Sequence, residues 1–371
     1  MLSFWERQSF INFDHIIIGG GIVGLSTAVA IKEKFPNQSI AILERGTFPT
    51  GASTKNAGFA CFGSLTEIMN DLKGMTEVEV QELVEFRWKG LELLRSRLGD
   101  DHIGFKNYGG YELLFEKDLD ALNSIEKVNE LLKPLFGQHV YSEAAGLISE
   151  FGFDQQQVKS LIKNPLEAQI DTGKMMKALE ALAQQLGIKL FTNCEVISFE
   201  ETPEGVTVNT AELSFKARKL AICSNAFTRR LLPEIELKPG RGVVLVTKPI
   251  TGLPFKGTFH YEEGYYYFRN YEDRIIFGGG RNLDVEGEES TEFEVRELIL
   301  DKLKTDLKSI ILPNQNFEVD MAWAGIMAFG KTKQPIVQKH SENIVLGVRL
   351  GGMGVAVGSK VGQRLASLML E

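Results

Sequence analysis

The feature that most constrains this chain is a glycine pattern, Gly19-x-Gly21-x-x-Gly24, placed between an apolar run and a helical pattern. Residues 13–18 predict a buried parallel strand, and residues 22–34 predict a helix. In this setting the first glycine permits a tight turn, the second lets a pyrophosphate approach the backbone, and the third lets helix and strand pack closely. The sequence therefore predicts a dinucleotide site at the helix N-terminus, at Ile22 and Val23.

A second strand is predicted over residues 39–44, and it ends on Glu44, 20 residues after Gly24. A carboxylate at this place accepts hydrogen bonds from ribose hydroxyls. The strand, the glycine turn and the acid in one register favour a bound dinucleotide over the alternative, a glycine-rich turn without a ligand.

The segment after Arg45 favours FAD over NAD. It is small, polar and rich in glycine, which suits an extended cofactor that crosses toward a second domain, whereas an NAD domain would continue into another strand and helix. The alternative is an exposed loop. The predicted cofactor contacts here are Arg45, Ser53, Thr54, Lys55, Asn56, Ala57 and Gly58.

The order of predicted elements indicates an α/β fold, α+β overall. Helical patterns cover residues 76–98, 117–132, 172–186 and 291–309, and a final helix runs from about 354 to 370. Strands are predicted over 188–223 and 344–348, and an antiparallel meander over 240–282. We therefore expect a Rossmann-like FAD-binding domain of discontinuous segments (1–80, 150–230 and 330–371) and an inserted substrate domain (81–149 and 231–329) on a mixed, largely antiparallel sheet.

Composition excludes several classes of protein. The 371 residues are 43% hydrophobic and 24% charged, with a net charge of -8, whereas a nucleic-acid binder is normally basic. Three cysteines are too few and too scattered for a disulfide framework, and no spacing of metal ligands is visible. The N-terminus has no signal-peptide pattern and no stretch predicts a membrane span, so we expect a cytoplasmic protein without a metal. The sequence is compatible with a homo-oligomer as well as with a monomer.

Four motifs together resemble the D-amino-acid oxidase superfamily of flavoproteins: GGGIVGLSTA, the ER dipeptide, GASTKNAG and LGGMGVAVGSKVGQRLA. They are most similar to the branch of gamma-glutamylputrescine oxidase and glycine oxidase. The resemblance covers nearly the whole chain and implies FAD. It adds as cofactor contacts Val196, Ser224, Asn225, Gly351, Gly352, Met353, Gly354 and Val355.

The last of these residues begin a predicted helix. Its N-terminal amides and dipole can face the N1–C2=O edge of the flavin and stabilise the negative charge of the reduced ring. The alternative is a loop that only starts a helix.

Two departures from the resembled families narrow the chemistry. Met327 stands where glycine oxidase and D-amino-acid oxidase carry an arginine for the substrate carboxylate, which predicts poor activity on glycine and D-amino acids. No cysteine follows residue 223, and Lys55 stands where histidine-linked relatives have histidine. Both observations predict non-covalent FAD.

The expected substrate pocket draws on few side chains: Phe59, Arg241, Tyr265, Tyr267, Trp323 and Met327. Tyr265 and Tyr267 share one face of a strand, although packing in a core or on the surface explains them equally well. Arg241 is either structural or a partner of a substrate carboxylate.

The predicted activity is oxidation of a C–N bond in a small-molecule amine or amino-acid derivative. Hydride passes to flavin N5, the resulting imine hydrolyses, and oxygen or another acceptor reoxidises the flavin. A neutral amine needs no protein base, so no catalytic acid or base is predicted. The alternatives are a dehydrogenase with a protein or quinone acceptor and a non-catalytic flavin-binding subunit.

Overall fold

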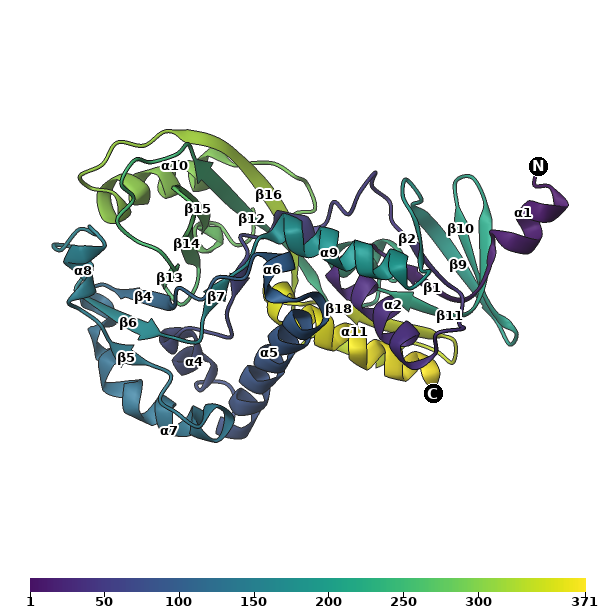
Figure 1. Cartoon of the computed structure of the whole chain (residues 1–371), viewed down its shortest axis with the longest axis horizontal. Helices are drawn as coiled ribbons and strands as arrows, with labels where there is room; N and C mark the ends of the chain where they lie inside the picture. Colours follow the sequence, from purple (N-terminus) through teal and green to yellow (C-terminus); the bar gives the residue numbers. More distant parts are fainter.

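The computed structural model describes all 371 residues and contains two eight-stranded sheets and one two-stranded sheet. Figure 1 shows the first large sheet on the right and the second on the left, and segments from both halves of the chain contribute to each. The predicted α/β architecture with a Rossmann-like sheet and a largely antiparallel second sheet is confirmed.

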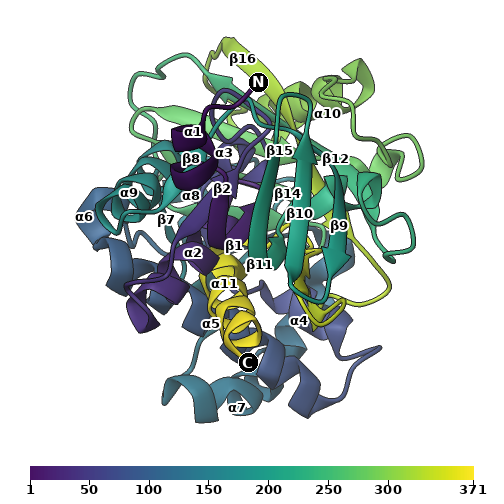
Figure 2. The same ribbon diagram turned by 90° about the vertical axis from the view of Figure 1, so that its right-hand side faces the viewer.

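The first sheet has the order β17-β18-β11-β1-β2-β8, with β10 and β9 attached to β11. Its central pairs are parallel, as the buried apolar strand at the N-terminus predicts. Figure 2 looks onto this end of the molecule and shows β2, β1 and β11 side by side. The strands are β1 (Asn12–Ile18), β2 (Ile40–Leu43), β8 (Lys189–Phe191), β9 (Val196–Thr202), β10 (Gly205–Thr210), β11 (Ser214–Ile222), β17 (Ile336–Lys339) and β18 (Ile344–Val348).

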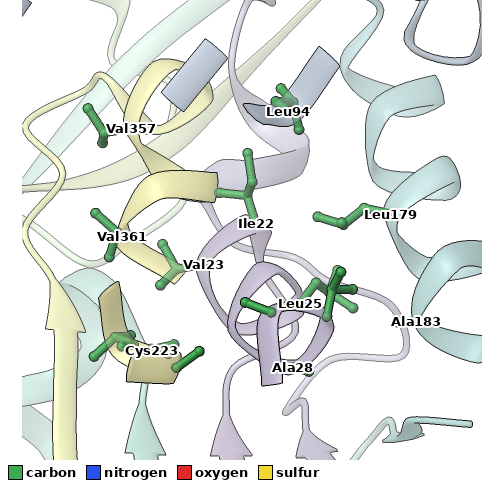
Figure 3. Close-up of a cluster of buried hydrophobic side chains, with 14 of the residues drawn as sticks. Ile22, Val23, Leu25, Ala28, Leu94, Leu179, Ala183, Cys223, Val357 and Val361 are labelled. Carbon is green, nitrogen blue, oxygen red and sulfur yellow. The ribbon is translucent and has the colours of Figure 1, made fainter. Parts of the chain in front are cut away.

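Three helices cover one face of this sheet, α2 (Ile22–Lys34), α9 (Thr172–Gln185) and α11 (Gly354–Leu370), and α5 (Glu77–Leu98) packs against α11. α2 is apolar all round because it lies between the sheet and the other helices. Figure 3 shows side chains of α2 between those of α11 on one side and of α5 and α9 on the other. The observed bounds of α2 match the predicted helix.

The second sheet has the order β16-β12-β15-β14-β13-β4-β6-β5, and all its pairs except β13 with β4 are antiparallel. One face packs on α10 (Glu297–Asp306) through a core that includes Phe259, Phe268 and Phe277. The strands are β4 (Gly110–Leu114), β5 (Ser142–Glu143), β6 (Ser160–Asn164), β12 (Lys238–Thr247), β13 (Thr258–Tyr261), β14 (Tyr266–Tyr271), β15 (Arg274–Gly279) and β16 (Val319–Phe329).

The remaining elements are short or cover the second sheet from its other face. β3 (Phe59–Ala60) pairs with β7 (Ala168–Gln169). α4 (Leu65–Asp71) and α7 (Ile125–Phe136) form a core with α5. The others are α1 (Phe4–Ser9), α3 (Ala52–Lys55), α6 (Asp100–Ile103), α8 (Leu147–Glu150), the 3₁₀ helices η1 (Glu116–Ser124), η2 (Asn225–Arg230) and η3 (Arg281–Leu283), and the π-helical turn η4 (Leu307–Ile311).

Some boundaries differ from the expectation. The helix predicted over 117–132 is a 3₁₀ segment followed by α7, and the helix predicted from 291 begins at Glu297. β6 lies inside the range expected for the FAD-binding domain, yet it pairs with β4 and β5 of the second sheet. The domain limits otherwise stay a prediction. None of the helices is both long and apolar enough to cross a membrane.

Candidate active site

A cavity of about 680 Å³ extends from the glycine turn of the first sheet to the inner face of the second. Its volume falls within the range of about 300–1,000 Å³ that is usual for small-molecule sites. The wall contains most of the predicted cofactor contacts and four of the six predicted pocket residues. Gly24, Thr54, Arg241 and Trp323 lie outside it.

The glycine turn has the geometry that its spacing predicts. Gly19 has a φ of +104°, and a Cβ built on it would lie 2.9 Å from the carbonyl oxygen of Cys223. A Cβ on Gly24 would lie 2.0 Å from the carbonyl oxygen of Gly19, so only glycine lets α2 approach the turn. Gly24 acts behind the cavity wall, whereas Gly19 and Gly21 line it.

Glu44 is 6% exposed and lines the cavity just beyond this turn. Its two oxygens accept backbone hydrogen bonds, Oε2 from the amide of Gly20 at 2.8 Å and Oε1 from the amide of Gly46 at 2.9 Å. A carboxylate has about four acceptor positions, so two remain for hydroxyl groups of a ligand. The geometry is that expected for a ribose contact.

The loop that carries α3 follows along the cavity. Ser53 Oγ accepts from the amide of Ile22 at 2.9 Å and so lies at the N-terminus of α2. The Asn56 side chain bonds within the loop, donating to the carbonyl of Ser53 at 3.0 Å and accepting from the amide of Gly58 at 2.9 Å. The predicted phosphate contact of Thr54 is wrong, because its hydroxyl donates to the carbonyl of Pro49 at 2.8 Å and lies outside the cavity wall.

The second sheet holds this loop in place. Trp323 Nε1 on β16 donates to the carbonyl of Lys55 at 2.9 Å. The buried Arg269 guanidinium on β14 donates to the carbonyls of Ala57 and Ile170. Burial lowers the pKa of Arg269 to about 10. Trp323 was predicted in the substrate pocket, but it acts as a support of the cofactor loop, since its one polar atom is bound to that loop.

Two helix N-termini meet at the cavity. α11 begins at Gly354 with no side-chain cap, after the turn of Gly351 (φ +57°) and Gly352 (φ +82°). A Cβ on Gly358 of α11 would lie 2.7 Å from Ile22, the first residue of α2. The positive ends of two helix dipoles therefore lie next to each other, an arrangement that attracts negative charge.

The far end of this half of the cavity alternates cations and aromatic rings. The Arg45 guanidinium lies 3.7 Å from the ring centroid of Phe227, which stacks at 6.3 Å on Phe293. Lys55 Nζ lies 5.1 Å from the Phe293 ring. Burial lowers the pKa of Arg45, and nearby Arg230 lowers it further. Through these contacts the loop after Arg45 packs against aromatic rings, whereas the alternative interpretation was a loop exposed to solvent.

The three remaining predicted contacts adjoin this end. Val196 is 8% exposed and lines the cavity. Ser224 Oγ lies 2.9 Å from the Thr228 hydroxyl. Asn225, whose φ is +45°, accepts from the amide of Arg349 at 3.1 Å.

The inner face of the second sheet forms the other half of the cavity. Antiparallel register places Met327 opposite Gly240 and Tyr267 opposite Gly278, all on the face away from α10. A Cβ on Gly242 would lie 2.8 Å from Met327 Cε and 4.0 Å from the Tyr267 hydroxyl, so glycine here opens the space that these side chains fill.

Aromatic side chains wall this half. The ring of Phe59 meets Tyr267 edge-on at 5.5 Å and His260 at 5.1 Å. Burial raises the pKa of Tyr267 to about 12, so its hydroxyl keeps its proton at neutral pH. Tyr265, 38% exposed, lines the outer part of the wall, while Tyr266 points into the opposite core.

Arg241 does not reach the cavity, so the substrate contact weighed for it is wrong. It is 3% exposed, and its Nε donates to Glu288, itself 1% exposed, at 2.8 Å. This hydrogen bond is the main reason that the pKa of Arg241 is raised. Arg296 also pairs with Glu288, at 3.0 Å, and the network fixes the segment between η3 and α10. Its residues are structural.

Several charged groups in the cavity wall were missed by sequence reasoning, because they come from distant segments and match no spacing. Glu67 Oε1 pairs with Arg87 at 3.2 Å and with Lys333 at 3.4 Å. Burial raises the pKa of Glu67, but these two cations and His260 outweigh it, and the pKa is lowered overall. Arg281 lies over the ring of Phe329, 4.2 Å from its centroid.

His260 and Glu167 form a second buried pair, with Nε2 and Oε2 3.1 Å apart. Burial lowers the pKa of His260, yet the charge of Glu167 outweighs it and the pKa is raised. The Cys61 thiol completes a group whose ligand-type atoms lie within 4.8 Å of one another. No sequence spacing reveals this group, and the expectation of no metal stays a prediction.

All three cysteines, Cys61, Cys194 and Cys223, are free and line the cavity. Burial raises the pKa of each thiol, that of Cys223 to about 12. Because the thiolate is the nucleophile, burial disfavours the attachment of a flavin through any of them.

The residues of the first half fit FAD. Glycine opens the wall at the turn before α2 and at the turn before α11, two helix N-termini offer amides to anions, and Glu44 keeps acceptor positions free. The N-terminus of α2, with the Ser53 hydroxyl beside it, would hold the pyrophosphate, Glu44 the ribose, and the 351–354 turn together with Ala57 and Gly58 the ring.

Comparison with known proteins agrees with this geometry. A family model described as FAD dependent oxidoreductase (DAO) matches residues 14–368. Glycine oxidase of Bacillus subtilis is 22% identical over 343 residues, 90% of this chain and 85% of that protein. L-2-hydroxyglutarate dehydrogenase of Escherichia coli is 23% identical over 231 residues, 62% of this chain and 51% of that protein. The crystal structure of glycine oxidase from Geobacillus kaustophilus superposes with a TM-score of 0.80 at 19% identity, covering 97% of this chain and 95% of that one.

Proposed function

The chain belongs to the DAO family of FAD-dependent oxidoreductases, and from that premise we propose that it oxidises the C–N bond of an amine or amino-acid derivative. The observation that carries the proposal is the single cavity, in which a glycine-lined half with two helix N-termini opens onto a half walled by aromatic rings. Similarity to the glycine oxidases supports oxidation of a C–N bond, since this similarity spans nearly the whole chain. The likeness to the hydroxy-acid dehydrogenase covers 62% of it.

FAD supplies the acceptor for two electrons when it is bound. The chain's own residues set the environment. Phe59, Met327 and Tyr267 line this half with apolar surface, and an apolar surrounding disfavours a charged ammonium relative to the neutral amine. The N-terminus of α11 stabilises negative charge at the opposite wall.

The direct test is anaerobic reduction of the flavin, followed as loss of its visible absorbance. The panel holds glycine, sarcosine, L-proline, gamma-glutamylputrescine and, as the C–O alternative, L-2-hydroxyglutarate. We expect an amine to reduce the flavin fastest. Fastest reduction by L-2-hydroxyglutarate would overturn the C–N assignment, and no reduction by any compound would favour a non-catalytic flavin-binding subunit.

Admitting oxygen to the reduced protein then distinguishes an oxidase from a dehydrogenase. Rapid reoxidation with release of peroxide identifies an oxidase, and slow reoxidation that a quinone or dye accelerates identifies a dehydrogenase. Acid precipitation should leave the flavin in the supernatant, because we propose that it is held without a covalent bond. Flavin that stays on the precipitate contradicts that proposal.

Within the amines, the proposal ranks alpha-amino acids low. Met327 offers no charge to a carboxylate on the reacting carbon, and an unpaired carboxylate loses hydration in such a wall without compensation. Glycine should therefore reduce the flavin more slowly than an amine whose carboxylate is distant or missing.

A further inference from the structure

Arg281 is the arginine of the sheet-side half of the cavity that has no protein anion beside it. Arg87 pairs with Glu67, but the Arg281 guanidinium forms no ion pair within 4.0 Å and no hydrogen bond, although Arg281 lines the cavity. One face of its guanidinium is occupied by the ring of Phe329, 4.2 Å away. An aromatic ring behind a guanidinium leaves its fork of donors free for a planar anion.

The position of Arg281 relative to Met327 follows from the glycines of β12. A Cβ on Gly242 would meet Met327 Cε at 2.8 Å, whereas a Cβ on Gly240 would meet the ring of Phe329 at 2.3 Å and Arg281 Cδ at 3.6 Å. These glycines are two residues apart on one strand, a step of about 6–7 Å.

The direction of that step is set by β16. Gly325 faces Lys55 of the cofactor loop, Met327 comes next, with its sulfur against Gly352, and Phe329 follows. Arg281 therefore lies past Met327, on the side away from the cofactor loop. A step of about 6–7 Å is much longer than the single C–C bond, about 1.5 Å, between the α-carbon and the carboxylate of an amino acid.

We propose that Arg281 binds a carboxylate several bonds away from the carbon that is oxidised, so that the substrate is an omega-amino acid or a similar amine with a distal carboxylate. A guanidinium binds a carboxylate through two parallel N–H···O bonds, which fixes the direction as well as the charge of the ligand. This inference rests on the proposed function, because it names the substrate class of the same site.

The test pairs amines that differ only in the carboxylate: glycine with methylamine, beta-alanine with ethylamine, gamma-aminobutyrate with propylamine, and delta-aminovalerate with butylamine. The concentration dependence of anaerobic flavin reduction is measured for each. In the native protein, the preference for the carboxylated member should be small for glycine and rise with chain length. Equal preference at all lengths, or the strongest preference for glycine, overturns the proposal.

Variants then assign the preference to the residue. Arg281→Gln should lower the preference for the longer acids about 10- to 100-fold, the range for losing a hydrogen bond between charged groups, and should leave the plain amines unchanged. Arg281→Lys should restore part of it. Lys331→Gln removes a cation at the rim that is 84% exposed and faces Glu236 at 3.5 Å, and should keep the preference. A preference that survives Arg281→Gln, or that is lost equally in Lys331→Gln, overturns the assignment.

A binding measurement separates this inference from the proposed function. Butyrate and valerate carry the carboxylate but no amine, and their binding to the holoprotein is followed by calorimetry. Valerate should bind more tightly than butyrate to the native protein and weakly to Arg281→Gln. If no amine reduces the flavin but valerate still requires Arg281, the proposed function fails and the carboxylate site stands. If amines reduce the flavin and valerate binds both proteins alike, the carboxylate site fails alone.

Discussion

The two halves of the cavity are built in different ways. The half at the first sheet consists mainly of backbone, with glycine at the turns, amides at two helix N-termini, and Glu44 held by the amides of Gly20 and Gly46. The half at the second sheet consists of side chains from separate elements, such as Tyr267 of β14, Met327 of β16 and Arg281 of η3. A backbone surface suits a ligand that never changes, while a surface of side chains can be altered residue by residue.

The largest effect should come from filling the closest backbone contact. In Gly24→Val, the Cβ would lie 2.0 Å from the carbonyl oxygen of Gly19, so α2 must move off the turn. We expect at least about 3 kcal/mol of lost stability, the upper range for overpacking, together with loss of flavin. Thermal unfolding and the ratio of flavin to protein absorbance measure the two effects.

Gly146→Val is the matched control, because a Cβ there meets nothing within 4 Å and the backbone has an ordinary helical φ of -58°. A Gly24→Val protein that keeps its flavin as well as the control does would show that the close contact is dispensable.

The next effect separates two arginines near the same strand. Arg241→Met leaves the buried carboxylate of Glu288 with Arg296 alone, which should cost about 3 kcal/mol of stability. Arg281→Met removes no ion pair and should change stability by less than about 0.5 kcal/mol. Urea unfolding of the two variants measures the difference. Equal losses would mean that Arg281 is also structural and would remove the contrast between them.

Glu44 tests the polar group of the backbone-built half. Glu44→Ala should weaken FAD binding by about 1–3 kcal/mol, because hydrogen bonds to a charged acceptor are lost. Titration of the apoprotein with FAD, followed by quenching of flavin fluorescence, measures the affinity. Glu44→Gln keeps one acceptor oxygen and should lie between Glu44→Ala and the native protein. Unchanged affinity in Glu44→Ala would show that this carboxylate does not hold the ribose.

The smallest expected effect tests the link between the halves. Trp323→Phe keeps a six-membered aromatic ring but removes the donor to the carbonyl of Lys55, and should weaken FAD binding by about 1 kcal/mol, the net value of one neutral hydrogen bond. The same titration applies. Trp88→Phe is the control, since its ring packs on Phe62 and Phe136, away from the loop. Equal affinities in both variants would show that the cofactor loop stays in place without this bond.

The difference between the halves explains what could be predicted from the sequence. Gly19, Gly24 and Glu44 are set by local chain geometry, so spacing alone predicts their places. Period-two alternation likewise predicts that Tyr265 and Tyr267 share a face, and both line the cavity.

Arg281 could not be predicted, because its neighbour Phe329 is far away in sequence and the two meet only through the pairing of β12 with β15 and β16. The substrate contact considered for Arg241 was wrong for the same reason. Its partner, Glu288, looks like one of many surface acids in the sequence. It is buried in the fold because the segment between η3 and α10 lies against β12, where the Arg241 amide donates to the Glu288 carbonyl. A threonine hydroxyl can contact a phosphate, so the residue type of Thr54 fitted the prediction. The direction of its side chain, however, depends on a turn that sequence spacing does not describe.

The residues that hold the cofactor loop in place are far from it in sequence, and this separation has a consequence for synthesis of the chain. Arg269 is 212 residues beyond its partner Ala57, and Trp323 is 268 residues beyond Lys55. The ribosome therefore completes the loop, the glycine turn and Glu44 long before the groups that hold the loop in place have been made. Strand β18, which flanks the centre of the first sheet, emerges later still. We therefore expect that FAD is acquired by a nearly finished chain, and that a ribosome stalled before β16 displays the whole glycine motif on a nascent protein that binds the cofactor weakly.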